Sequence, residues 1–329
     1  MVTTVAVVLA GGTGTRLYPA SRADRPKQFQ SFGGERSLLE RAVDRAGVAD
    51  EQFVLTRAAY AERVRNHVPS ATVLVEPEPR DTGPALVYAA HRVRELVDDP
   101  VVFAMPSDHV VGEGFAETAR RAISVATETD GIVTVGVAPT RPATEYGYVQ
   151  LGAAEDGYAE VVQFREKPDE ETAREFVDEG FLWNAGMFAF RPGALLREAR
   201  ASPLASLVEA LEADRPDAGF DETASVSIDY AVLEGATDVF VVPTAVTWDD
   251  LGSWDALARL LDGENAVLGE ALSIDASGNV VASDDKHVSV LGVDDLVVAA
   301  YDDRVLVVPK AEAQRVREVV AALRETGAF

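Results

Sequence analysis

Cysteine is absent from the 329-residue chain. Its absence excludes disulfides, thiolate nucleophiles and zinc or iron-sulfur centres that need cysteine ligands. The four histidines are scattered along the sequence, at His67, His91, His109 and His287, which argues against a metal site built from several histidines. Lysine is also scarce, with four lysines against 26 arginines. A lysine inside a motif is therefore a strong candidate for function.

Long hydrophobic runs are missing as well. A transmembrane helix needs about 20 consecutive apolar residues, and the longest runs here have the length of a strand. The apolar run Val5 to Ala10 follows no positive charge and leads directly into a glycine-rich turn, which is not the pattern of a signal peptide. We therefore expect a cytoplasmic protein with no membrane association.

Basic residues are few relative to acidic ones. The chain has 30 basic and 55 acidic side chains, which give a net charge of −25. Such a surface repels nucleic acid unless a local basic patch exists, and the sequence shows none. A hydrophobic content of 47% with 26% charged residues is typical of a globular chain rather than a disordered acidic one. The lysine-poor, acid-rich composition predicts a halophilic protein that works in concentrated salt.

Strand-like runs alternate with helical patterns over the first 140 residues, which indicates an α/β fold with a mostly parallel sheet. A capping box formed by Ser37 and Glu40 opens one predicted helix, and Pro84 begins another. The predicted strands are Thr4 to Leu9, Gln52 to Thr56, Thr72 to Glu76, Val101 to Met105 and Ile132 to Val137.

The pattern changes twice after residue 140. Residues 145–242 are more irregular and read as an insertion at the binding edge of the sheet, with strands near Tyr148 to Leu151, Tyr158 to Glu166 and Leu182 to Phe190. After Gly263, short valine-rich strands at 273–307 precede an amphipathic helix at 311–324. We therefore predict a catalytic domain at residues 1–262 and a small β-rich domain, ending in a helix, at residues 263–329.

A glycine-rich segment, Leu9 to Leu17, follows the first predicted strand. Glycines permit positive φ angles and let backbone N–H groups approach a phosphate, so the segment is a candidate phosphate loop. It fits neither the Walker A nor the dinucleotide-binding pattern. The cations Arg16 and Lys27 favour a polyphosphate ligand over a plain tight turn.

Two acidic motifs supply candidate metal ligands. Asp108 follows a predicted parallel strand, at the edge where open α/β sheets bind ligands, although it could also cap a turn. Asp249 and Asp250 lie between Trp248 and Trp254, in a segment that could alternatively be an acidic helix start. Asp108 with a second carboxylate would give Mg²⁺ the two hard oxygen ligands that it usually takes from protein when it binds a nucleotide.

Two further motifs complete the pattern. Glu166-Lys167-Pro168 ends a predicted strand and suits a monophosphate, or else is a solvated strand end. Asn184 offers an amide that can donate and accept, and Gly186 permits a close backbone approach, although by themselves these residues read as part of an ordinary buried strand. Together with Gly11 to Leu17 and Pro26 to Phe29, these motifs resemble those of sugar-phosphate nucleotidyltransferases, and specifically the mannose-1-phosphate guanylyltransferases.

The resemblance covers nearly the whole chain and implies a Rossmann-like nucleotidyltransferase domain with a mixed, mostly parallel sheet, then a left-handed β-helix-like C-terminal domain. It makes Asp250 rather than Asp249 the second metal ligand, and Asp229 a further sugar-side candidate beside a plain helical explanation. The implied catalytic residues are Arg16, Lys27, Asp108, Lys167 and Asp250, with Mg²⁺ on Asp108 and Asp250. The implied nucleotide-binding residues are Ala10, Gly11, Gly12, Thr13, Gly14, Thr15, Arg16, Lys27, Arg80, Thr82, Ser107 and Asp108. The implied sugar-phosphate-binding residues are Gly147, Glu166, Lys167, Asn184 and Gly186.

By the same resemblance, the expected substrates are GTP and mannose 1-phosphate and the products GDP-mannose and pyrophosphate. The sequence ends without the isomerase domain of some relatives, so guanylyl transfer alone is expected. Two alternatives remain open, namely another pair such as glucose 1-phosphate with dTTP or UTP, and a non-catalytic regulatory subunit that binds nucleotide sugars. A homodimer is compatible with the sequence, which does not determine the oligomeric state.

Overall fold

The computed structural model describes residues 2–261, 263–327 and 329, which form two compact units. Unit 1 comprises Met1–Gly11, Ala42–Pro106 and Val111–Trp248, and unit 2 comprises Gly12–Arg41, Ser107–Val110 and Asp249–Phe329. Unit 2 therefore includes residues 12–41 and 107–110, which the sequence analysis grouped with the catalytic domain. Asp262, the last residue of that predicted domain, lies outside the described residues, and the boundary at 262/263 stays a prediction.

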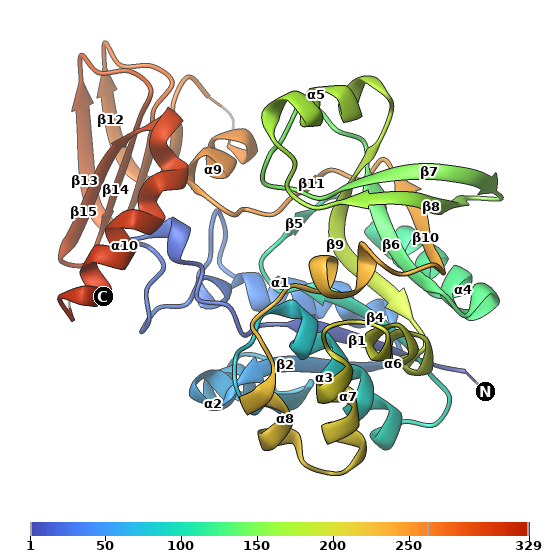
Figure 1. Cartoon of the computed structure of the whole chain (residues 1–329). Coiled ribbons are helices and arrows are strands. Elements are labelled where there is room, and N and C mark those ends of the chain that lie inside the picture. Colours follow the sequence, from blue (N-terminus) through green and yellow to red (C-terminus); the bar gives the residue numbers. More distant parts are fainter. Residues whose placement is uncertain (1, 262, 328) are drawn as a thin grey trace. The chain divides into compact units, whose positions relative to one another are not determined.

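Unit 1 is built on a nine-stranded sheet in the order β3-β2-β1-β4-β9-β6-β10-β8-β7 (Figure 1). The strands β1, β2, β3 and β4 pair in parallel, as do β6 and β10. Strands β8 and β9 run against the others, so the sheet is mixed but mostly parallel, as predicted. The bounds are β1 Thr3–Leu9, β2 Glu51–Arg57, β3 Thr72–Glu76, β4 Pro100–Pro106, β6 Ile132–Val137, β7 Tyr148–Glu155, β8 Tyr158–Arg165, β9 Leu182–Phe190 and β10 Val239–Thr244.

The expectation that residues 145–242 form an insertion at the binding edge of the sheet is wrong for β9 and β10, whereas β8 and β7 do lie at one end of the strand order. Strand β9 lies inside the sheet, between β4 and β6, and β10 lies between β6 and β8. Strand β9 pairs antiparallel with both β4 and β6. The connections to β9 therefore do not follow the strand-helix-strand pattern of the first half, which is why this region looks irregular in sequence.

Helices cover both faces of the central strands, as β4 shows. Val102 and Ala104 belong to a core cluster with residues of α3, α6 and α7, while Phe103 points to the other face and meets Phe115 of α4 at 5.9 Å between ring centroids. Burial on both faces explains why the strand is a continuous apolar run. The helical bounds in unit 1 are η3 Ala46–Val48, α2 Ala58–His67, α3 Thr82–Leu96, α4 Phe115–Thr129, α5 Glu170–Asp178, α6 Pro192–Arg200, α7 Ala205–Glu212, α8 Pro216–Glu222 and the π-turn η4 Asp229–Leu233.

Helix α3 begins at Thr82, two residues before the predicted start at Pro84. Its N-cap is Asp81, whose side chain accepts a hydrogen bond from the Thr82 N–H. Pro84 fits inside the first turn because the first N–H groups of a helix have no partner within the helix. Proline therefore indicates the first turn of this helix without fixing its first residue.

Unit 2 contains a four-stranded sheet in the order β12-β13-β14-β15, with α10 beside it (Figure 1). Strands β12, β13 and β14 pair in parallel and β15 is antiparallel to β14. Val316 and Val320 of α10 share a core cluster with Val297, Leu306 and the fully buried Trp254. The bounds are η1 Thr15–Leu17, η2 Lys27–Phe29, α9 Trp254–Leu260, β12 Ala266–Ile274, β13 Val280–Leu291, β14 Leu296–Tyr301, β15 Arg304–Pro309, η5 Lys310–Arg315 and α10 Val316–Glu325.

Three short elements each have residues in both units. Helix α1 spans Leu38–Arg45, and the two-residue strands β5 (Val110–Val111) and β11 (Trp248–Asp249) form a ladder of their own. Ser37 and Glu40 make the predicted capping box, since the Glu40 N–H donates to the Ser37 hydroxyl (3.2 Å) and the Glu40 carboxylate accepts from the Ser37 N–H (2.7 Å). In the described part of the chain, no helix is long and apolar enough to cross a bilayer.

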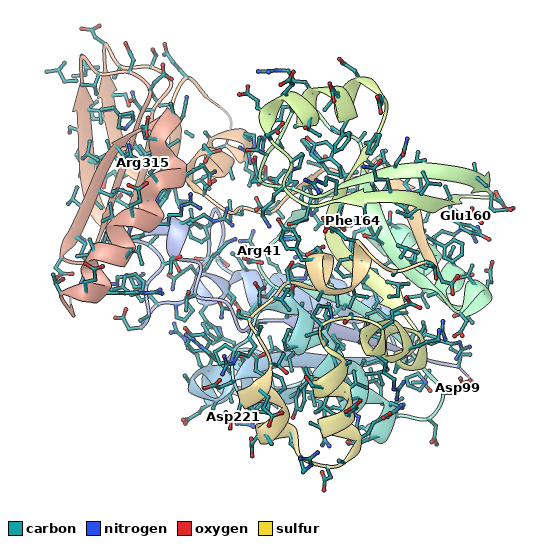
Figure 2. The ribbon with its side chains drawn as sticks, viewed as in Figure 1. Arg41, Asp99, Glu160, Phe164, Asp221 and Arg315 are labelled. Carbon is teal, nitrogen blue, oxygen red and sulfur yellow. The ribbon has the colours of Figure 1, made fainter. Side chains whose placement is uncertain are left out.

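Surface charge leads to a first prediction, about salt. Exposed ion pairs such as Arg315 with Glu312 and Glu318 (3.1 and 3.0 Å; Arg315 is labelled in Figure 2) contribute little each. The net charge of −25 acts on the whole fold, and salt screens this self-repulsion. The thermal midpoint should therefore rise between about 0.1 M and about 3 M KCl, where the Debye length falls from about 10 Å to below about 3 Å.

Thermal melts followed by circular dichroism would measure this effect, with initial rates recorded alongside, since we expect activity to peak at molar KCl. Sucrose is the control, because it stabilises proteins by exclusion without screening charge. A midpoint that is highest at the lowest salt concentration would refute the halophilic interpretation.

Candidate functional site

The predicted site residues fall into two groups, each inside one unit. Arg16, Lys27, Asp108 and Asp250 belong to unit 2 and are called the Lys27 cluster. The predicted sugar-phosphate residues belong to unit 1, and with Asp229 they are called the Lys167 cluster.

Lys27 is the centre of the first cluster. Its side chain is 4% exposed, and its ammonium donates to Asp108 Oδ2 at 2.8 Å and to the backbone oxygen of Asp250 at 2.9 Å. The lysine thereby brings together two segments that are 142 residues apart in sequence, the end of β4 and the Trp-Asp-Asp motif. A buried ammonium between these carboxylate-bearing segments forms a compact site of alternating charge.

The glycine-rich loop packs directly on this lysine. Gly14 has a φ of 64°, and a Cβ atom there would lie 2.3 Å from Lys27 Cβ, so only glycine fits. The Thr13 carbonyl accepts a hydrogen bond from the Ser21 hydroxyl at 2.6 Å, which fixes the loop before the turn η1 that carries Thr15 and Arg16. Gly12 to Arg16 are thus in unit 2 with Lys27, whereas Ala10 and Gly11 follow β1 in unit 1.

Both carboxyl groups of the cluster are held in the ionised form. Burial alone would raise the pKa of Asp108, but the charge and hydrogen bond of Lys27 and the nearby His109 outweigh it and lower the pKa. Burial likewise opposes ionisation of Asp250, and the charges of Lys27, His109 and Arg16 lower its pKa. Two anionic oxygen donors are therefore ready to bind a cation at neutral pH.

Asp249 and Asp250 have different partners, which supports the assignment of Asp250. Both oxygens of Asp249 are used inside the protein, one by the Leu251 N–H (2.9 Å) and the other by Arg259 (2.9 Å). Asp250 Oδ1 accepts from the Gly252 N–H at 2.9 Å. Asp249 therefore has a structural role in the turn before α9, and Asp250 is the carboxylate that belongs to the Lys27 cluster.

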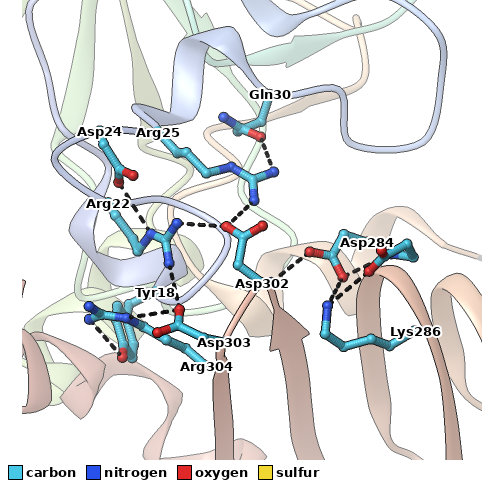
Figure 3. A network of polar contacts seen from close by, with 11 residues as sticks. Tyr18, Arg22, Asp24, Arg25, Gln30, Asp284, Lys286, Asp302, Asp303 and Arg304 are labelled. Carbon is cyan, nitrogen blue, oxygen red and sulfur yellow. Dashed lines mark hydrogen bonds and ion pairs between the residues drawn. The ribbon is translucent and has the colours of Figure 1, made fainter.

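An ion-pair network anchors the loop that carries Lys27 (Figure 3). Asp302, in the turn between β14 and β15, accepts from Arg22 and from Arg25, each at 2.6 Å. The side chain of Arg22 is only 9% exposed, and Asp302 is held in turn by its N–H on Asp284 (2.6 Å). The C-terminal sheet thus positions the segment from which Lys27 projects.

Two other predicted nucleotide-binding residues make side-chain contacts inside the protein, and a third is buried. The Thr82 hydroxyl accepts a hydrogen bond from the Ile228 N–H at 3.0 Å, which ties the start of α3 to the segment before η4. Arg80 pairs with Glu78 at 2.5 Å, but its Nε is buried without a hydrogen-bond partner in the described structure. Ser107 is 3% exposed and precedes Asp108.

The Lys167 cluster is built on the ends of β8 and β9 in unit 1. The Lys167 ammonium donates to Glu166, whose side chain is 6% exposed, while the Lys167 side chain is 51% exposed. Burial opposes the charge of Lys167, but Glu166 and Asp229 outweigh it and raise its pKa. The geometry suits an exposed cation that rests on a buried carboxylate and can receive an anion from solvent.

Asn184 holds this cluster together through its side-chain hydrogen bonds. Its side-chain oxygen accepts from the Thr134 hydroxyl (2.7 Å) and the Gly186 N–H (3.0 Å), and its amide donates to Asp229 (2.9 Å). Burial and repulsion from Glu166 raise the pKa of Asp229 to about 7. The oxygen of Asn184 is thus occupied by two donors, and its amide holds Asp229 in place.

Two glycines and an aromatic group border the cluster. A Cβ atom on Gly147 would lie 2.5 Å from Glu166 Oε2, so the carboxylate rests directly on this backbone, and the Gly147 carbonyl accepts from the Asn184 N–H. Gly186 has a φ of 66°. The rings of Tyr146 and Trp183 lie 5.1 Å apart, and Trp248 lies 5.0 Å from Tyr146.

The sequence analysis missed Glu76, the last residue of β3. The residue is 5% exposed, and burial raises the pKa of its carboxyl to about 7 although the charge of Arg57 opposes the rise. The same signal that indicated Asp108, a polar residue at the carboxyl end of a buried parallel strand, is present at this residue. A carboxylate at that edge is a candidate for ligand contact as well as the end of its strand.

The raised pKa of Glu76 predicts how stability depends on pH. Between pH 4.5 and about 7 the carboxyl is neutral in the folded state and ionised in the unfolded state, so its contribution to stability is lost as pH rises through this window. Glu76→Gln removes the ionisation and should be more stable than wild type by about 2 to 3 kcal/mol near pH 8, with little difference near pH 4.

Urea unfolding of both proteins across this pH range would measure the effect. Glu62→Gln on the exposed face of α2 is the matched control and should follow wild type at every pH. A Glu76→Gln variant that is less stable than wild type near pH 8 would show that the native carboxylate is stabilised by partners instead of strained by burial.

The chemistry of the Lys27 cluster fits a divalent cation bound together with a ligand. The described residues include no group of three or more acidic or histidine side chains that could hold a metal alone. Mg²⁺ usually takes one or two carboxylates from protein and completes its shell with phosphate and water. Asp108 and Asp250, both with lowered pKa values, supply that number of anionic oxygens.

Comparison with known proteins shows two family matches along the chain. The family described as Nucleotidyl transferase matches residues 5–266, and the MannoseP isomerase/GMP-like beta-helix domain matches residues 269–323. These matches confirm the predicted fold class, with a nucleotidyltransferase domain followed by a β-helix-like domain.

Individual relatives match over nearly the full chain. The xanthan biosynthesis protein XanB of Xanthomonas campestris is 36% identical, and the match covers 98% of this chain and 73% of that protein. The mannose-1-phosphate guanylyltransferase of Escherichia coli K12 is 35% identical, with coverage of 98% and 73%. The crystal structure of mannose-1-phosphate geranyltransferase from Thermus thermophilus is 37% identical, covers 98% of this chain and 99% of that one, and superposes with a TM-score of 0.91. The chain therefore belongs to the nucleotidyl transferase family and carries a MannoseP isomerase/GMP-like β-helix domain at its C-terminal end.

Proposed function

We propose that the protein transfers GMP from GTP to mannose 1-phosphate and so forms GDP-mannose and pyrophosphate. The observation that carries the proposal is Lys27, buried between Asp108 and Asp250 and packed on the glycine-rich loop. The name of the Escherichia coli relative gives the same reaction. The name of the Thermus structure gives a geranyl group instead, and we follow the guanylyl group because the matching family is one of nucleotidyl transferases.

The reaction needs no covalent enzyme intermediate, because the nucleophile is already an anion. A phosphate oxygen of mannose 1-phosphate attacks the α-phosphorus of GTP in line. The bond from that phosphorus to the bridging oxygen breaks, and its electron pair leaves with pyrophosphate. The protein contributes by positioning the reactants and neutralising charge.

The Lys27 cluster serves the nucleotide side. Lys27 and Arg16 neutralise the triphosphate and the charge that develops on the leaving pyrophosphate. Backbone N–H groups of the segment 10–15 approach the phosphates, which the glycines permit. The network on Asp302 keeps Lys27 in place before the substrate binds.

Asp108 and Asp250 would hold Mg²⁺ in the same cluster. The ion, when bound, supplies Lewis-acid polarisation and charge neutralisation at the α-phosphate. Lys27 keeps both carboxylates ionised at neutral pH, so that the site does not lose its ligands to protonation.

The Lys167 cluster serves the sugar phosphate. The exposed ammonium of Lys167 meets the phosphate as a point charge, and Glu166 beneath it holds the ammonium. Asp229 and the backbone around Gly147 and Gly186 face the sugar hydroxyls. Asn184 acts as a positioning residue, because its amide fixes Asp229 at 2.9 Å.

We further propose a cytoplasmic setting in concentrated salt, with small-molecule substrates and neither nucleic acid nor membrane as a partner. The net charge of −25 supports the exclusion of polyanions. A homodimer is compatible with this setting.

Pyrophosphate release with four nucleoside triphosphates and a panel of hexose 1-phosphates tests the proposal. GTP with mannose 1-phosphate should give the highest kcat/KM. A preference for glucose 1-phosphate with dTTP or UTP would replace the substrates but keep the chemistry, and no release with any pair would favour a regulatory subunit.

A further inference from the structure

A cavity of about 430 Å³ lies in unit 1 where β4 begins and β9 ends, and it is called the amino-edge cavity. Phe190 at the end of β9 pairs with Val102 near the start of β4, so the cavity lies at the edge where β4 enters the sheet. Asn184 of the Lys167 cluster is seven residues before Arg191, which is roughly 20 Å along a strand. The cavity is therefore separate from the proposed sugar-phosphate site.

Arginine side chains dominate the lining of the amino-edge cavity. Four guanidinium groups and two carboxylates line it, in a chain whose net charge is −25. One of the carboxylates belongs to Asp99, which is labelled in Figure 2. A local excess of positive charge in so acidic a chain attracts an anionic ligand. The charged lining residues are Arg94, Asp99, Asp130, Arg191, Arg197 and Arg200.

Two of these guanidinium groups keep most of their donors free. Arg191 donates to Asp99 at 2.8 Å through one terminal nitrogen, and Arg200 donates to Glu212 through one terminal nitrogen. Arg94 lies 3.7 Å from the same oxygen of Glu212, so two cations share this carboxylate. A guanidinium group has five N–H donors, and the described residues take no others from Arg191 or Arg200. Both side chains can therefore bind a ligand without giving up their partners.

Helix α6 supports the same interpretation from its first turn. The helix begins at Pro192, and Gly193 beside it also lines the cavity. The first N–H groups of a helix have no partner within the helix, and its dipole favours an anion there. Arg197 on the next turn is held by the Asp130 side chain (3.3 Å) and carbonyl (3.0 Å) and lies 3.8 Å from Glu198. Arg197 thus ties α6 to the end of α4 and shapes the cavity wall.

Guanidinium groups bind phosphate oxygens through two parallel N–H donors, which makes arginine the residue best suited to this ligand chemistry. A volume of about 430 Å³ is in the range of small-molecule sites, about 300 to 1,000 Å³, and exceeds what a single inorganic phosphate fills. We propose that the amino-edge cavity is a second ligand site, which binds a phosphorylated small molecule through Arg191 and Arg200. The site goes beyond the proposed function, because both substrates are assigned to the Lys27 and Lys167 clusters.

Calorimetric titration with inorganic tripolyphosphate tests the proposal in wild type and in the double variant Arg191→Gln/Arg200→Gln. The Lys27 and Lys167 clusters are the same in both proteins, so a difference in binding reports the amino-edge cavity. We expect the double variant to lose one binding event, with affinity at that site reduced roughly 10- to 100-fold, as for the loss of one charge-assisted hydrogen bond. The titrations are made at the lowest KCl concentration at which both proteins stay folded, because salt screens the attraction.

Two further variants separate the cavity from the charge of the protein as a whole. Arg174→Gln removes an exposed arginine of α5 that pairs with Glu170, and it should bind tripolyphosphate as wild type does. Arg191→Lys/Arg200→Lys keeps both charges but not the paired donors, and its affinity should fall between wild type and the glutamine variant. Wild-type stoichiometry and affinity in the glutamine variant would overturn the proposal. An equal loss in Arg174→Gln would also overturn it, since binding would then depend on net charge alone.

Discussion

Asp108→Asn and Asp250→Asn should each lower kcat by at least about a hundredfold, since each removes an anionic ligand from a site whose rate depends on charge neutralisation. An amide keeps the shape of the side chain but binds a hard cation far more weakly than a carboxylate does. Both residues carry lowered pKa values and lie around one ammonium, so each substitution also changes the charge balance of the Lys27 cluster. Turnover measured across a titration with Mg²⁺ would show the loss and its partial recovery at high metal concentration.

Asp249→Asn is the matched control, because it alters the neighbouring carboxylate without touching the proposed metal ligand. Its cost should appear in stability, through the lost ion pair with Arg259, and only mildly in kcat. If Asp249→Asn and Asp250→Asn showed the same loss of kcat and the same dependence on metal, the ligand would have been assigned to the wrong residue.

Regular strands are the part of the fold that the sequence predicted best. The predicted runs Thr72 to Glu76, Ile132 to Val137 and Leu182 to Phe190 coincide with β3, β6 and β9. Each is an apolar run bounded by turn-forming residues, so local pattern and burial agree. Strand order was beyond this reasoning, because the place of β9 between β4 and β6 depends on pairings between residues about 90 positions apart in the chain, such as Val102 with Phe190.

The first residues of helices were likewise not predicted correctly from the sequence. The predicted helix at 311–324 begins instead as a 3₁₀ segment, Lys310–Arg315, before α10. Hydrophobic spacing indicates which face of a helix is buried, but the first turn is set by which N–H groups find partners. The start of α3 depends on Asp81, whose φ of 71° no local pattern indicated.

Within the site, motifs predicted the charged residues and missed the polar contacts between distant segments. Lys27 and Asp108 stood out because each follows a recognisable element, and the structure joins them at 2.8 Å. The hydrogen bonds of Thr82 to Ile228 and of Asn184 to Asp229 connect segments that meet only after folding. These contacts turn two predicted ligand residues into positioning residues.

Substitutions of Lys27 and Lys167 should affect the kinetics of different substrates, because the two lysines belong to different clusters. Lys167→Met should raise KM for mannose 1-phosphate roughly 10- to 100-fold and leave KM for GTP nearly unchanged, as expected for the loss of one charge-assisted contact in the bound ground state. Lys27→Met should lower kcat with GTP by at least about a hundredfold, since it removes the charge that faces the leaving pyrophosphate and leaves Asp108 without its partner.

Arginine variants separate charge from position at the two sites. Lys167→Arg keeps the charge at an exposed site and should recover most of the affinity for the sugar phosphate. Lys27→Arg should not recover kcat, because Lys27 is buried and its ammonium is held by Asp108 at 2.8 Å and by the Asp250 backbone oxygen at 2.9 Å, contacts that a larger planar guanidinium would displace. Steady-state kinetics with each substrate varied would measure all four variants. Identical profiles for Lys27→Met and Lys167→Met would mean that the two lysines serve one substrate, and the division of the site into a nucleotide side and a sugar side would have to be abandoned.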